Sequence, residues 1–598
     1  MVSTPNGTGT VDPEMSPAAM AVLADRYLRR DDNGRVCESV GQMMDRVAGF
    51  VAQAEDAYRA HEADRWAARF SRLLRSREFL PNSPTLMNAG TGSPVLSGCF
   101  VLPIEDSLDS IFTTLRTTAL LHQAGAGTGF SFAHLRPRDD RVCSTGARAS
   151  GPVSFIGLYD AATQVIRLGG RRRGASMAVL DVHHPDIREF VTAKSDPAAL
   201  PTFNLSVGVT DEFMLAAVAD RPHPLINPRT GRVVREISAR GLLETIVAEA
   251  WRTGEPGLLF LDAINRANPL PALGALEATN PCGEVPLAPN ESCNLGSLAL
   301  PRFLSGDRID EQRLGRAVRV AVRFLDDVID VADYPAPELA AAAHATRKIG
   351  LGIMGLADTL AALGLPYDSE AAVRFTQRLM YRISRWAHAA SRALAAERGA
   401  FPRYSGSVWA PLPGGPMRNA QVTSVAPTGT ISLLAGTSAG IEPLFALAYT
   451  RHILGREFDQ VEPLFERLAT ERGIWTPALA AEIAATGTAD HPGVPADLRR
   501  RFVTALEMEP YWHIRMQAAV QRHTDAAVAK TVNLPETAAV GQVHDVFHQA
   551  WRAGCKGTTV YRSGSRRDQV LRPPPPGPDG RVDVHGTYSG GPPIGGQG

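Results

Sequence analysis

Two neighbouring segments of this 598-residue chain carry its most specific pattern: Asn280-Pro281-Cys282-Gly283-Glu284 and, shortly after it, Ser292-Cys293-Asn294-Leu295-Gly296-Ser297. Side chains two residues apart point to the same side of an extended segment, so we expect Asn280, Cys282 and Glu284 to share one face. Pro281 fixes the direction of the chain, and Gly283 leaves room for a ligand beside the backbone. Such a face combines an amide, a reactive sulfur and a proton acceptor. The alternative is a loop with a buried, inert cysteine, and the spacing alone does not decide between the two.

The overall composition is that of an ordinary globular protein. Hydrophobic residues make up 44% and charged residues 21% of the chain, which is typical of globular domains. The formal net charge is zero, so no overall positive field attracts nucleic acid. The sequence contains no apolar run of about 18 residues, and its first residues lack the basic and apolar regions of a signal peptide. We therefore expect a cytoplasmic protein that binds neither membranes nor nucleic acid.

Cysteines are few, and none are arranged as a Cys-x-x-Cys pair. So small a number in a long cytoplasmic chain argues against a structural disulfide framework. The absence of a Cys-x-x-Cys pair argues against a zinc ribbon or a thioredoxin-type motif, and we expect no metal site. The thiols are therefore available for chemical roles. Their positions are Cys37, Cys99, Cys143, Cys282, Cys293 and Cys555.

The chain divides into four expected regions. Residues 1–16 are rich in Gly, Thr and Pro and are predicted to be disordered, whereas residues 17–80 have apolar side chains at helical spacing. Across residues 81–563, segments rich in Val, Ile and Leu alternate with helical patterns, which predicts an α/β fold. Residues 564–598 are predicted to form a flexible Pro/Gly-rich tail.

Local patterns add four predictions within the α/β region. Residues 96–102 should form a strand, and residues 106–111 should open a helix. Gly350-x-Gly352-x-x-Gly355 has the spacing of a dinucleotide-binding loop but follows Thr346-Arg347-Lys348; because no strand precedes it, we interpret it as part of a helix. Gly125-x-Gly127-x-Gly129 indicates a close approach of backbone segments beside the binding site.

The pattern Asn280-x-Cys282-x-Glu284 resembles the active-site loop of the large subunit of ribonucleotide reductases, and the resemblance extends over roughly residues 20 to 572. It implies a ten-stranded α/β barrel of two five-stranded parallel halves, with the Cys282 loop threaded through its centre and a small N-terminal helical region. It also implies a reaction. Cys282 becomes a thiyl radical that removes the ribose 3′ hydrogen, Glu284 acts as general base and Asn280 holds the ribose.

Two further cysteines match the reducing pair of this family: Cys99 within Ser97-Gly98-Cys99, and Cys293 within Ser292-Cys293-Asn294-Leu295-Gly296-Ser297. Loss of the 2′ hydroxyl as water consumes two electrons, which two thiols supply by becoming a disulfide. This role requires that their Cα atoms lie within about 7 Å of each other. Cys37, Cys143 and Cys555 match no catalytic position, and we interpret them as structural.

The C-terminal segment bears on the source of the radical. Members of the family that import a radical from a second subunit carry adjacent tyrosines there, whereas here Tyr561 follows Val560. The segment resembles the adenosylcobalamin-dependent class, as do Arg172-Arg173-Gly174-Ala175-Ser176-Met177 and Gln521-Arg522-His523-Thr524-Asp525. We therefore predict an adenosylcobalamin-dependent ribonucleoside-diphosphate reductase. The alternatives are a large subunit that uses a separate metal-bearing subunit, and a non-catalytic nucleotide-binding relative.

The resemblance also implies binding residues for two nucleotides. The expected contacts of the ribonucleotide substrate are Ser83, Thr85, Gly98, Pro427, Thr428, Gly429, Thr430, Ile431 and Ser432. A deoxynucleotide effector is expected at the interface of a homodimer. Its expected contacts are Asp106, Ser107, Leu108, Arg171, Arg172 and Arg173.

One departure from many relatives concerns the reductant. They carry a C-terminal cysteine pair that re-reduces the active-site disulfide, but no cysteine follows Cys555 in this sequence. We expect a thioredoxin-like reductant, or a separate chain that bears the cysteines, to take this part.

Overall fold

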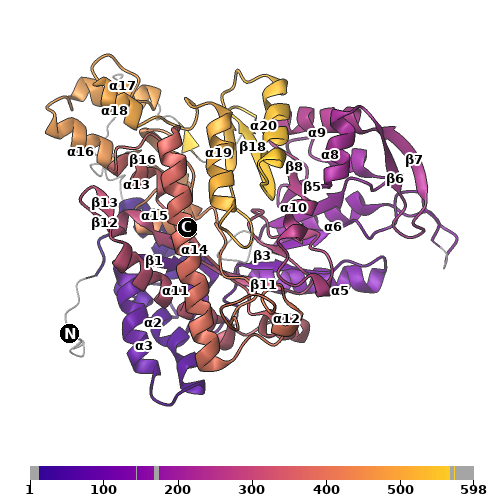
Figure 1. Ribbon diagram of the computed structural model, residues 1–598, viewed down its shortest axis with the longest axis horizontal. Helices are drawn as coiled ribbons and strands as arrows, with labels where there is room; N and C mark the ends of the chain where they lie inside the picture. The colour runs from indigo at the N-terminus through magenta and orange to yellow at the C-terminus, as the bar shows by residue number, and fades with distance from the viewer. Residues whose placement is uncertain (1–11, 94, 143–144, 167–173, 566–570, 573–598) are drawn as a thin grey trace, which may run out of the picture.

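The structure is a computed structural model that describes residues 12–93, 95–142, 145–166, 174–565 and 571–572 (Figure 1). Its elements confirm the predicted α/β class: helices surround a ten-stranded sheet that mixes parallel and antiparallel pairs. No helix among these residues is long and apolar enough to cross a membrane.

The chain begins with helices, as the apolar spacing predicts. Helix α2 (Val40–Ala52) starts after a capping box in which Ser39 and Gln42 satisfy each other's backbone N–H groups, a common start signal. Met43, Val47 and Val51 lie on its buried face and join a core shared with helix α11 (Glu311–Val331). The other helices here are α1 (Pro17–Val22) and α3 (Ala63–Arg75).

Five strands form a parallel set: each pairs in parallel with the next. They are β2 (Cys99–Val101), β3 (Gly127–Ser131), β4 (Ser176–Asp181), β5 (Phe203–Val209) and β8 (Gly257–Phe260). The predicted strand over 96–102 is confirmed as the shorter β2. The predicted helix start at 106–111 is confirmed as well, because Ser107 caps α5. Helices of this part are α5 (Leu108–Gln123), α6 (Pro152–Ile166), α8 (Asp211–Val218) and α9 (Ala239–Thr253).

A second group of parallel pairings follows. Strand β11 (Ser292–Ala299) pairs in parallel with β14 (Ile349–Met354), and β17 (Thr531–Leu534) pairs in parallel with β18 (Gly557–Arg562). Two single parallel bridges connect these pairs through an intervening segment: Leu351 with Thr423, and Val425 with Val528.

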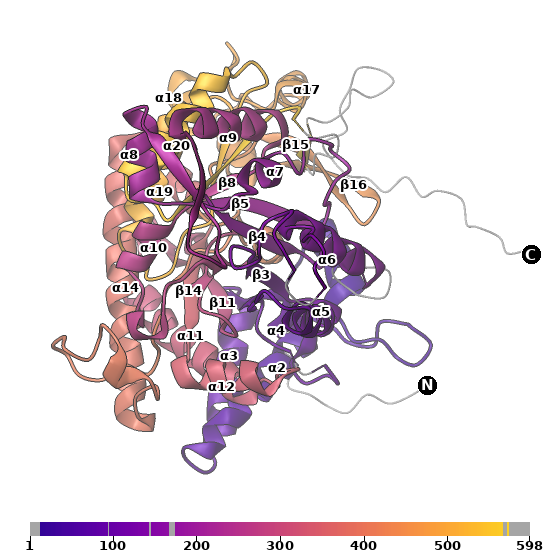
Figure 2. The same cartoon turned by 90° about the vertical axis from the view of Figure 1, so that its right-hand side faces the viewer.

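The two groups meet antiparallel at both flanks, β11 against β2 and β18 against β8. A short strand, β1 (Phe79–Pro81), adds to β11. Figure 2 shows the strands in the middle, with α14 (Glu370–Arg398) and α19 (Pro510–Gln521) on one side and α5 and α6 on the other. A small apolar cluster that includes Cys99 and Cys293 draws its residues from both groups of strands.

The remaining elements lie around this framework. The helices are α4 (Ser83–Asn88), α7 (Ile187–Val191), α10 (Leu261–Arg266), α12 (Pro337–Thr346), α13 (Leu356–Ala362), α15 (Gly429–Ala435), α16 (Pro463–Glu471), α17 (Pro477–Thr486), α18 (Ala496–Arg501) and α20 (Val540–Arg552). The strands are β6 (Pro222–Ile226), β7 (Val233–Ser238), β9 (Ala278–Thr279), β10 (Pro286–Leu287), β12 (Leu304–Ser305), β13 (Arg308–Ile309), β15 (Ala448–Ile453), β16 (Arg456–Val461) and β19 (Leu571–Arg572).

The helix predicted over Gly350–Gly355 is wrong, because these residues form strand β14 and the turn after it. The glycines serve tight strand packing: a Cβ on Gly350 would lie 2.3 Å from Leu295 Cδ2, and one on Gly352 would lie 2.4 Å from the Ser424 carbonyl oxygen. The helix begins only after Gly355, whose φ is +77°.

Candidate active site

The segment Asn280–Glu284 forms the turn of a hairpin whose arms are β9 and β10. The Gly283 N–H donates to the Asn280 carbonyl at 3.1 Å, and Gly283 has a φ of +80°. The chain therefore reverses here, and the prediction of one shared face is wrong. Cys282 is exposed, whereas Asn280 and Glu284 are buried. Proline in the second and glycine in the fourth position favour such a turn, so the sequence contained the signal.

Asn280 connects the hairpin to strand β2. Its side-chain amide donates to Cys99 Sγ at 3.2 Å, and its Oδ1 accepts from the Val285 N–H at 3.0 Å. The amide thus fixes the turn and at the same time contacts one of the two predicted reducing thiols.

Cys99 and Cys293 are direct partners in the antiparallel pairing of β2 with β11. Residues directly opposite each other in such a pair have Cα atoms about 4.5–5.5 Å apart, which lies within the range that a disulfide spans. Both cysteines are buried, with Cys99 6% and Cys293 0% exposed. The structure therefore brings together two thiols that are 194 positions apart in the sequence (293 − 99).

Glycines of β3 let the hairpin approach closely. A Cβ on Gly129 would lie 1.8 Å from the Thr279 carbonyl oxygen, and one on Gly127 would lie 2.8 Å from Pro281 Cγ. The close approach indicated by these glycines is therefore an approach of the hairpin itself.

Both groups of strands hold the hairpin. Asn204 of β5 donates its side-chain amide to the Pro281 carbonyl at 2.8 Å. On the other side, Ser424 Oγ and the Ala527 N–H donate to the Glu284 carbonyl at 2.9 and 2.8 Å. The hairpin thus lies between the two groups, with Cys282 at its tip.

The surroundings of Cys293 are apolar but not free of charge. Complete burial raises the pKa of the Cys293 thiol far above its usual value, the nearby Lys348 ammonium lowers it, and Glu284 and Glu291 raise it. The side-chain amide of Gln421 lies 3.9 Å from the sulfur. At rest, the Cys293 sulfur is therefore a protonated thiol.

Of the predicted substrate residues, those near residue 83 lie beside β11. Asn82 caps the short helix α4 by accepting from the Thr85 N–H at 3.2 Å, and it donates to the Leu295 carbonyl at 3.2 Å. A Cβ on Gly98 would lie 3.4 Å from Asn82 Cγ, so this position is next to Asn82. Ser83 and Thr85 are buried, and the Ser83 hydroxyl accepts from Tyr27 at 2.8 Å.

The predicted phosphate segment, Pro427–Ser432, includes the first residues of α15 and begins three residues after Ser424, which contacts the hairpin. Thr428 has a φ of +54°, and its hydroxyl accepts from the Gly440 N–H at 2.7 Å, which fixes the entry to the helix. The first N–H groups of a helix have no partner within it, and Gly429 is exposed there. Pro427 and Thr430 are partly exposed, whereas Ile431 and Ser432 are buried.

The predicted effector residues lie at the start of α5. Arg136 Nε donates to the Asp106 carboxylate at 2.8 Å. Ser107 accepts from the Ser110 N–H at 3.2 Å as the helix cap, and Leu108 is 65% exposed. The remaining predicted effector residues, Arg171, Arg172 and Arg173, lie outside the described residues.

The other cysteines differ from one another. Cys555 is fully buried, as a structural thiol should be, whereas Cys37 is exposed and has no packing role. Cys143 lies outside the described residues. Sequence reasoning also missed Asn204, Ser424 and Gln421, because nothing in the local sequence of a single polar residue indicates a contact with a distant hairpin.

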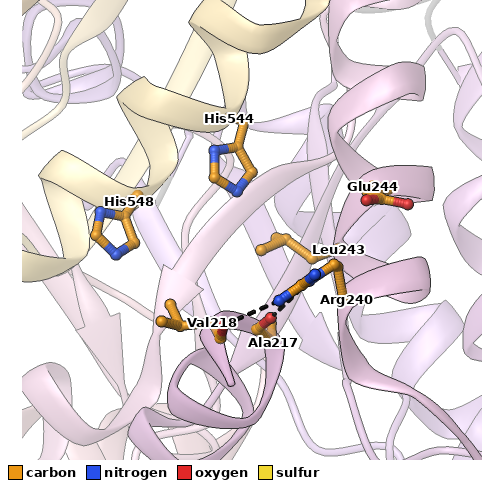
Figure 3. A pocket seen from close by; sticks show the side chains of 7 residues that line it. All are labelled: Ala217, Val218, Arg240, Leu243, Glu244, His544 and His548. Carbon is orange, nitrogen blue, oxygen red and sulfur yellow. Dashed lines mark hydrogen bonds between the residues drawn. The ribbon is translucent and has the colours of Figure 1, made fainter. Parts of the chain in front are cut away.

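A separate pocket of about 290 Å³ opens between α8, α9 and α20 (Figure 3). His544 and His548 border it from α20, opposite Arg240, which donates to the Val218 carbonyl at 3.1 Å and to the Ala217 carbonyl at 3.4 Å. None of the predicted site residues lines it, so this pocket is not part of the cysteine site.

Sequence comparison identifies the class of protein that this fold and site define. Residues 97–412 and 414–561 match the family described as "Ribonucleotide reductase, barrel domain", and residues 14–94 match "Ribonucleotide reductase, all-alpha domain". The chain belongs to the ribonucleotide reductases.

Among its relatives are proteins named vitamin B12-dependent ribonucleoside-diphosphate reductase. Those of two Mycobacterium tuberculosis strains are 60% and 61% identical over 94% and 93% of this chain, which covers 82% and 79% of their lengths. That of Thermoplasma acidophilum is 43% identical over 94% of this chain and 80% of its own length.

Proposed function

We propose that this protein reduces ribonucleoside diphosphates to 2′-deoxyribonucleoside diphosphates in a vitamin B12-dependent reaction. The observation that carries the proposal is the register of β2 and β11, which makes Cys99 and Cys293 direct neighbours while Asn280 contacts Cys99 from the Cys282 hairpin. The names and similarity of the relatives support the same reaction and cofactor.

Each residue of the site takes a defined part. The Cys282 sulfur, as a thiyl radical, removes the 3′ hydrogen of the ribose, and Glu284 accepts the 3′ hydroxyl proton. The 2′ hydroxyl leaves as water. Cys99 and Cys293 supply the two electrons that this loss consumes and become a disulfide, after which Cys282 returns its hydrogen to C3′.

The position of Cys282 fits a radical that arrives from a cofactor. Its side chain is exposed at the tip of the turn, and a Cβ on the neighbouring Gly283 would meet no atom within 4 Å, so space is open beside the thiol. When bound, adenosylcobalamin supplies a carbon-centred radical by homolysis of its cobalt–carbon bond. The exposed Cys282 thiol would supply the hydrogen atom that this chemistry consumes, and Cys282 would then act on the substrate as a thiyl radical.

The finer architecture belongs to the same proposal. The two groups of parallel strands form a barrel of two five-stranded halves, with the hairpin threaded between them. It occupies residues 81–563 and follows a helical region over residues 17–80. Most of the two predicted terminal segments, residues 1–16 and 564–598, lies outside the described residues. Substrate phosphates bind the Pro427–Ser432 segment, where helix N–H groups are available to an anion.

The same proposal includes regulation and the supply of electrons. A deoxynucleotide effector binds beside Asp106, Ser107 and Leu108 in a homodimer. Helix α5 exposes two apolar side chains that are suited to a contact between subunits, Leu108 and Phe112. A thioredoxin-like dithiol, or a separate chain that bears cysteines, re-reduces the disulfide.

The decisive test is anaerobic turnover of CDP and CTP with adenosylcobalamin and dithiothreitol. We expect dCDP to form without any second subunit. Cys282→Ser should abolish turnover and leave nucleotide binding within about twofold. Cys37→Ser, which changes an exposed cysteine away from the hairpin, should be fully active. Activity that requires a metal-bearing subunit in place of the cofactor, or substantial turnover by Cys282→Ser, would contradict the proposal.

A further inference from the structure

A buried ion pair lies beside the reducing cysteines, and the reaction outlined above makes no use of it. Lys348 Nζ and Glu291 Oε2 are 2.5 Å apart, and their side chains are 1% and 3% exposed. Glu291 Oε2 also accepts from the Ala288 N–H at 2.7 Å. The second oxygen, Glu291 Oε1, is buried without a hydrogen-bond partner among the described residues.

Strand register places both charges on the side of Cys293. In the parallel pairing of β11 with β14, Asn294 lies opposite Ile349. Cys293 and Lys348 are the residues immediately before these two, so they lie next to each other on the two paired segments. Alternate residues of a strand share a face. Lys348 therefore shares its face with Gly350, whose Cβ would lie 3.4 Å from Cys293 Sγ.

Stability alone does not explain such a pair. Removing two charges from water costs several kcal/mol per ion, and replacing a buried pair by apolar residues is often neutral or stabilising. Ala288, whose N–H contacts Glu291, belongs with Cys293 to the small apolar cluster described above. The pair therefore occupies a place where charge is expensive and where a sulfur changes its charge during the reaction.

We propose that Lys348 is a positioning residue for re-reduction of the Cys99–Cys293 disulfide, because its ammonium stabilises the Cys293 sulfur as a leaving thiolate. This inference rests on the proposed function, in which these two cysteines form the redox disulfide. Glu291 holds the ammonium in place.

The step proceeds by thiol–disulfide exchange with an external dithiol. One thiolate of the dithiol attacks Sγ of Cys99, the more exposed of the two residues. A new S–S bond to Cys99 forms, the Cys99–Cys293 bond breaks, and Cys293 leaves with the electron pair. The second thiolate of the dithiol then attacks the dithiol sulfur that is bonded to Cys99, and Cys99 leaves as a thiolate. The dithiol is oxidised to a disulfide, and the two protein thiolates take up protons from solvent.

Leaving-group stability governs the rate of such an exchange, since a thiol of lower pKa leaves faster. Complete burial raises the pKa of the Cys293 thiol, and among the charged groups that act on it Lys348 lowers the pKa, whereas Glu284 and Glu291 raise it. Removing Lys348 and removing Glu291 should therefore change the exchange rate in opposite directions.

The test needs neither nucleotide nor cobalamin. The full-length protein is oxidised, the Cys99–Cys293 disulfide is confirmed by mass spectrometry, and its reduction by dithiothreitol is followed by quenching with iodoacetamide. Lys348→Met should slow the reduction at least tenfold, and Lys348→Arg should stay within about threefold of the unchanged protein. In Glu291→Gln, whose amide oxygen can still accept from the ammonium, the disulfide should be reduced faster than in the unchanged protein.

A matched control is Lys194→Met, which breaks another largely buried lysine–carboxylate pair, with Glu255 at 2.8 Å, away from the cysteines. Its reduction rate should not change. An unchanged rate in Lys348→Met, or an unchanged or slower rate in Glu291→Gln, would overturn the proposal. Should Lys348→Met not fold, the sign of the Glu291→Gln effect decides.

Failure of this inference is distinguishable from failure of the proposed function. If CDP turnover depends on Cys282 but the reduction rate ignores Lys348, only the role of Lys348 is wrong. If no Cys99–Cys293 disulfide forms on oxidation, the proposed function itself is contradicted.

Discussion

At the scale of single residues, the site depends on side chains that are absent. Strand β3 carries glycine at positions 127 and 129, where any Cβ would enter the Cys282 hairpin. At position 129 the Cβ would meet the backbone of Thr279, and at position 127 it would meet the ring of Pro281. Neither neighbour is the end of a flexible side chain, so these positions determine how deeply the hairpin lies between the strands.

Gly129→Ala should therefore displace the hairpin. The added Cβ meets the Thr279 carbonyl oxygen at 1.8 Å, and such overpacking costs about 1–3 kcal/mol or more. We expect a lower melting temperature in calorimetry and a loss of most CDP turnover. Gly541→Ala is the control: it lies in α20, where a Cβ meets nothing within 4 Å, and it should stabilise the helix by about 0.5–1 kcal/mol. Full activity of Gly129→Ala would contradict this account of the hairpin.

At the scale of elements, one carboxylate holds residues 422–425, the segment that connects the β11–β14 pair with the β17–β18 pair. Asp525 accepts from the Val422 and Thr423 N–H groups at 2.9 and 3.1 Å, and His388 of α14 lies 3.0 Å from both of its oxygens. The helix thus fixes the segment that continues to the predicted phosphate site.

This contact should make stability depend on pH. Burial lowers the pKa of His388, but the Asp525 carboxylate outweighs burial and raises the pKa above its usual value of 6.5. A histidine whose pKa is raised by folding stabilises the folded protein. This contribution to the free energy of unfolding is fully present below the pKa of the unfolded state, about 6.5, and is lost as the pH rises through the pKa of the folded state.

The variant that checks this dependence is His388→Gln. Its melting temperature should lie furthest below that of the unchanged protein at pH 6, where the lost charged hydrogen bond contributes about 1–3 kcal/mol. The difference should shrink toward pH 9. His544→Gln, at an exposed histidine of α20, should show no such trend, and a gap for His388→Gln that stays constant with pH would count against the ion pair.

At the scale of the whole molecule, buried charges join the N-terminal helices to the α/β part. Glu55 lies 2.6 Å from Arg323 of α11 and 2.7 Å from Arg398 of α14, and Arg398 also pairs with Asp326 and Asp327. Glu55 is 2% exposed. Its carboxylate therefore compensates cations that belong to the other part of the chain.

Glu55→Gln should loosen this connection. Breaking a buried pair by removing one partner costs about 3–5 kcal/mol, so we expect a lower melting temperature and faster limited proteolysis of the N-terminal helices. Glu62→Gln changes a nearby carboxylate that pairs with the exposed Arg59 and Arg65, and it should have little effect. Equal proteolysis rates for the two variants would show that the cluster does not hold the helices.

Particular residues show how far the sequence could be taken. The N-terminal helices, strand β2 and the start of α5 followed from apolar spacing and capping residues, which are local signals. The extended reading of Asn280–Glu284 failed because the turn preference of Pro281 and Gly283 outweighs alternation. The prediction of a helix at Gly350 was wrong because those glycines are required by close contacts with Leu295 and Ser424, which are distant in sequence.

The sequence by itself determined the α/β class, the reductase motifs and the identity of the reactive groups, because these depend on residue type and short spacing. Only the tertiary structure decided that Cys99 faces Cys293, that Cys282 lies at the tip of a hairpin between two groups of strands, and that Lys348 and Glu291 accompany the buried thiol. The physical reason is that strand register and close backbone approach are set by contacts between segments far apart in the chain, and no local pattern records those contacts.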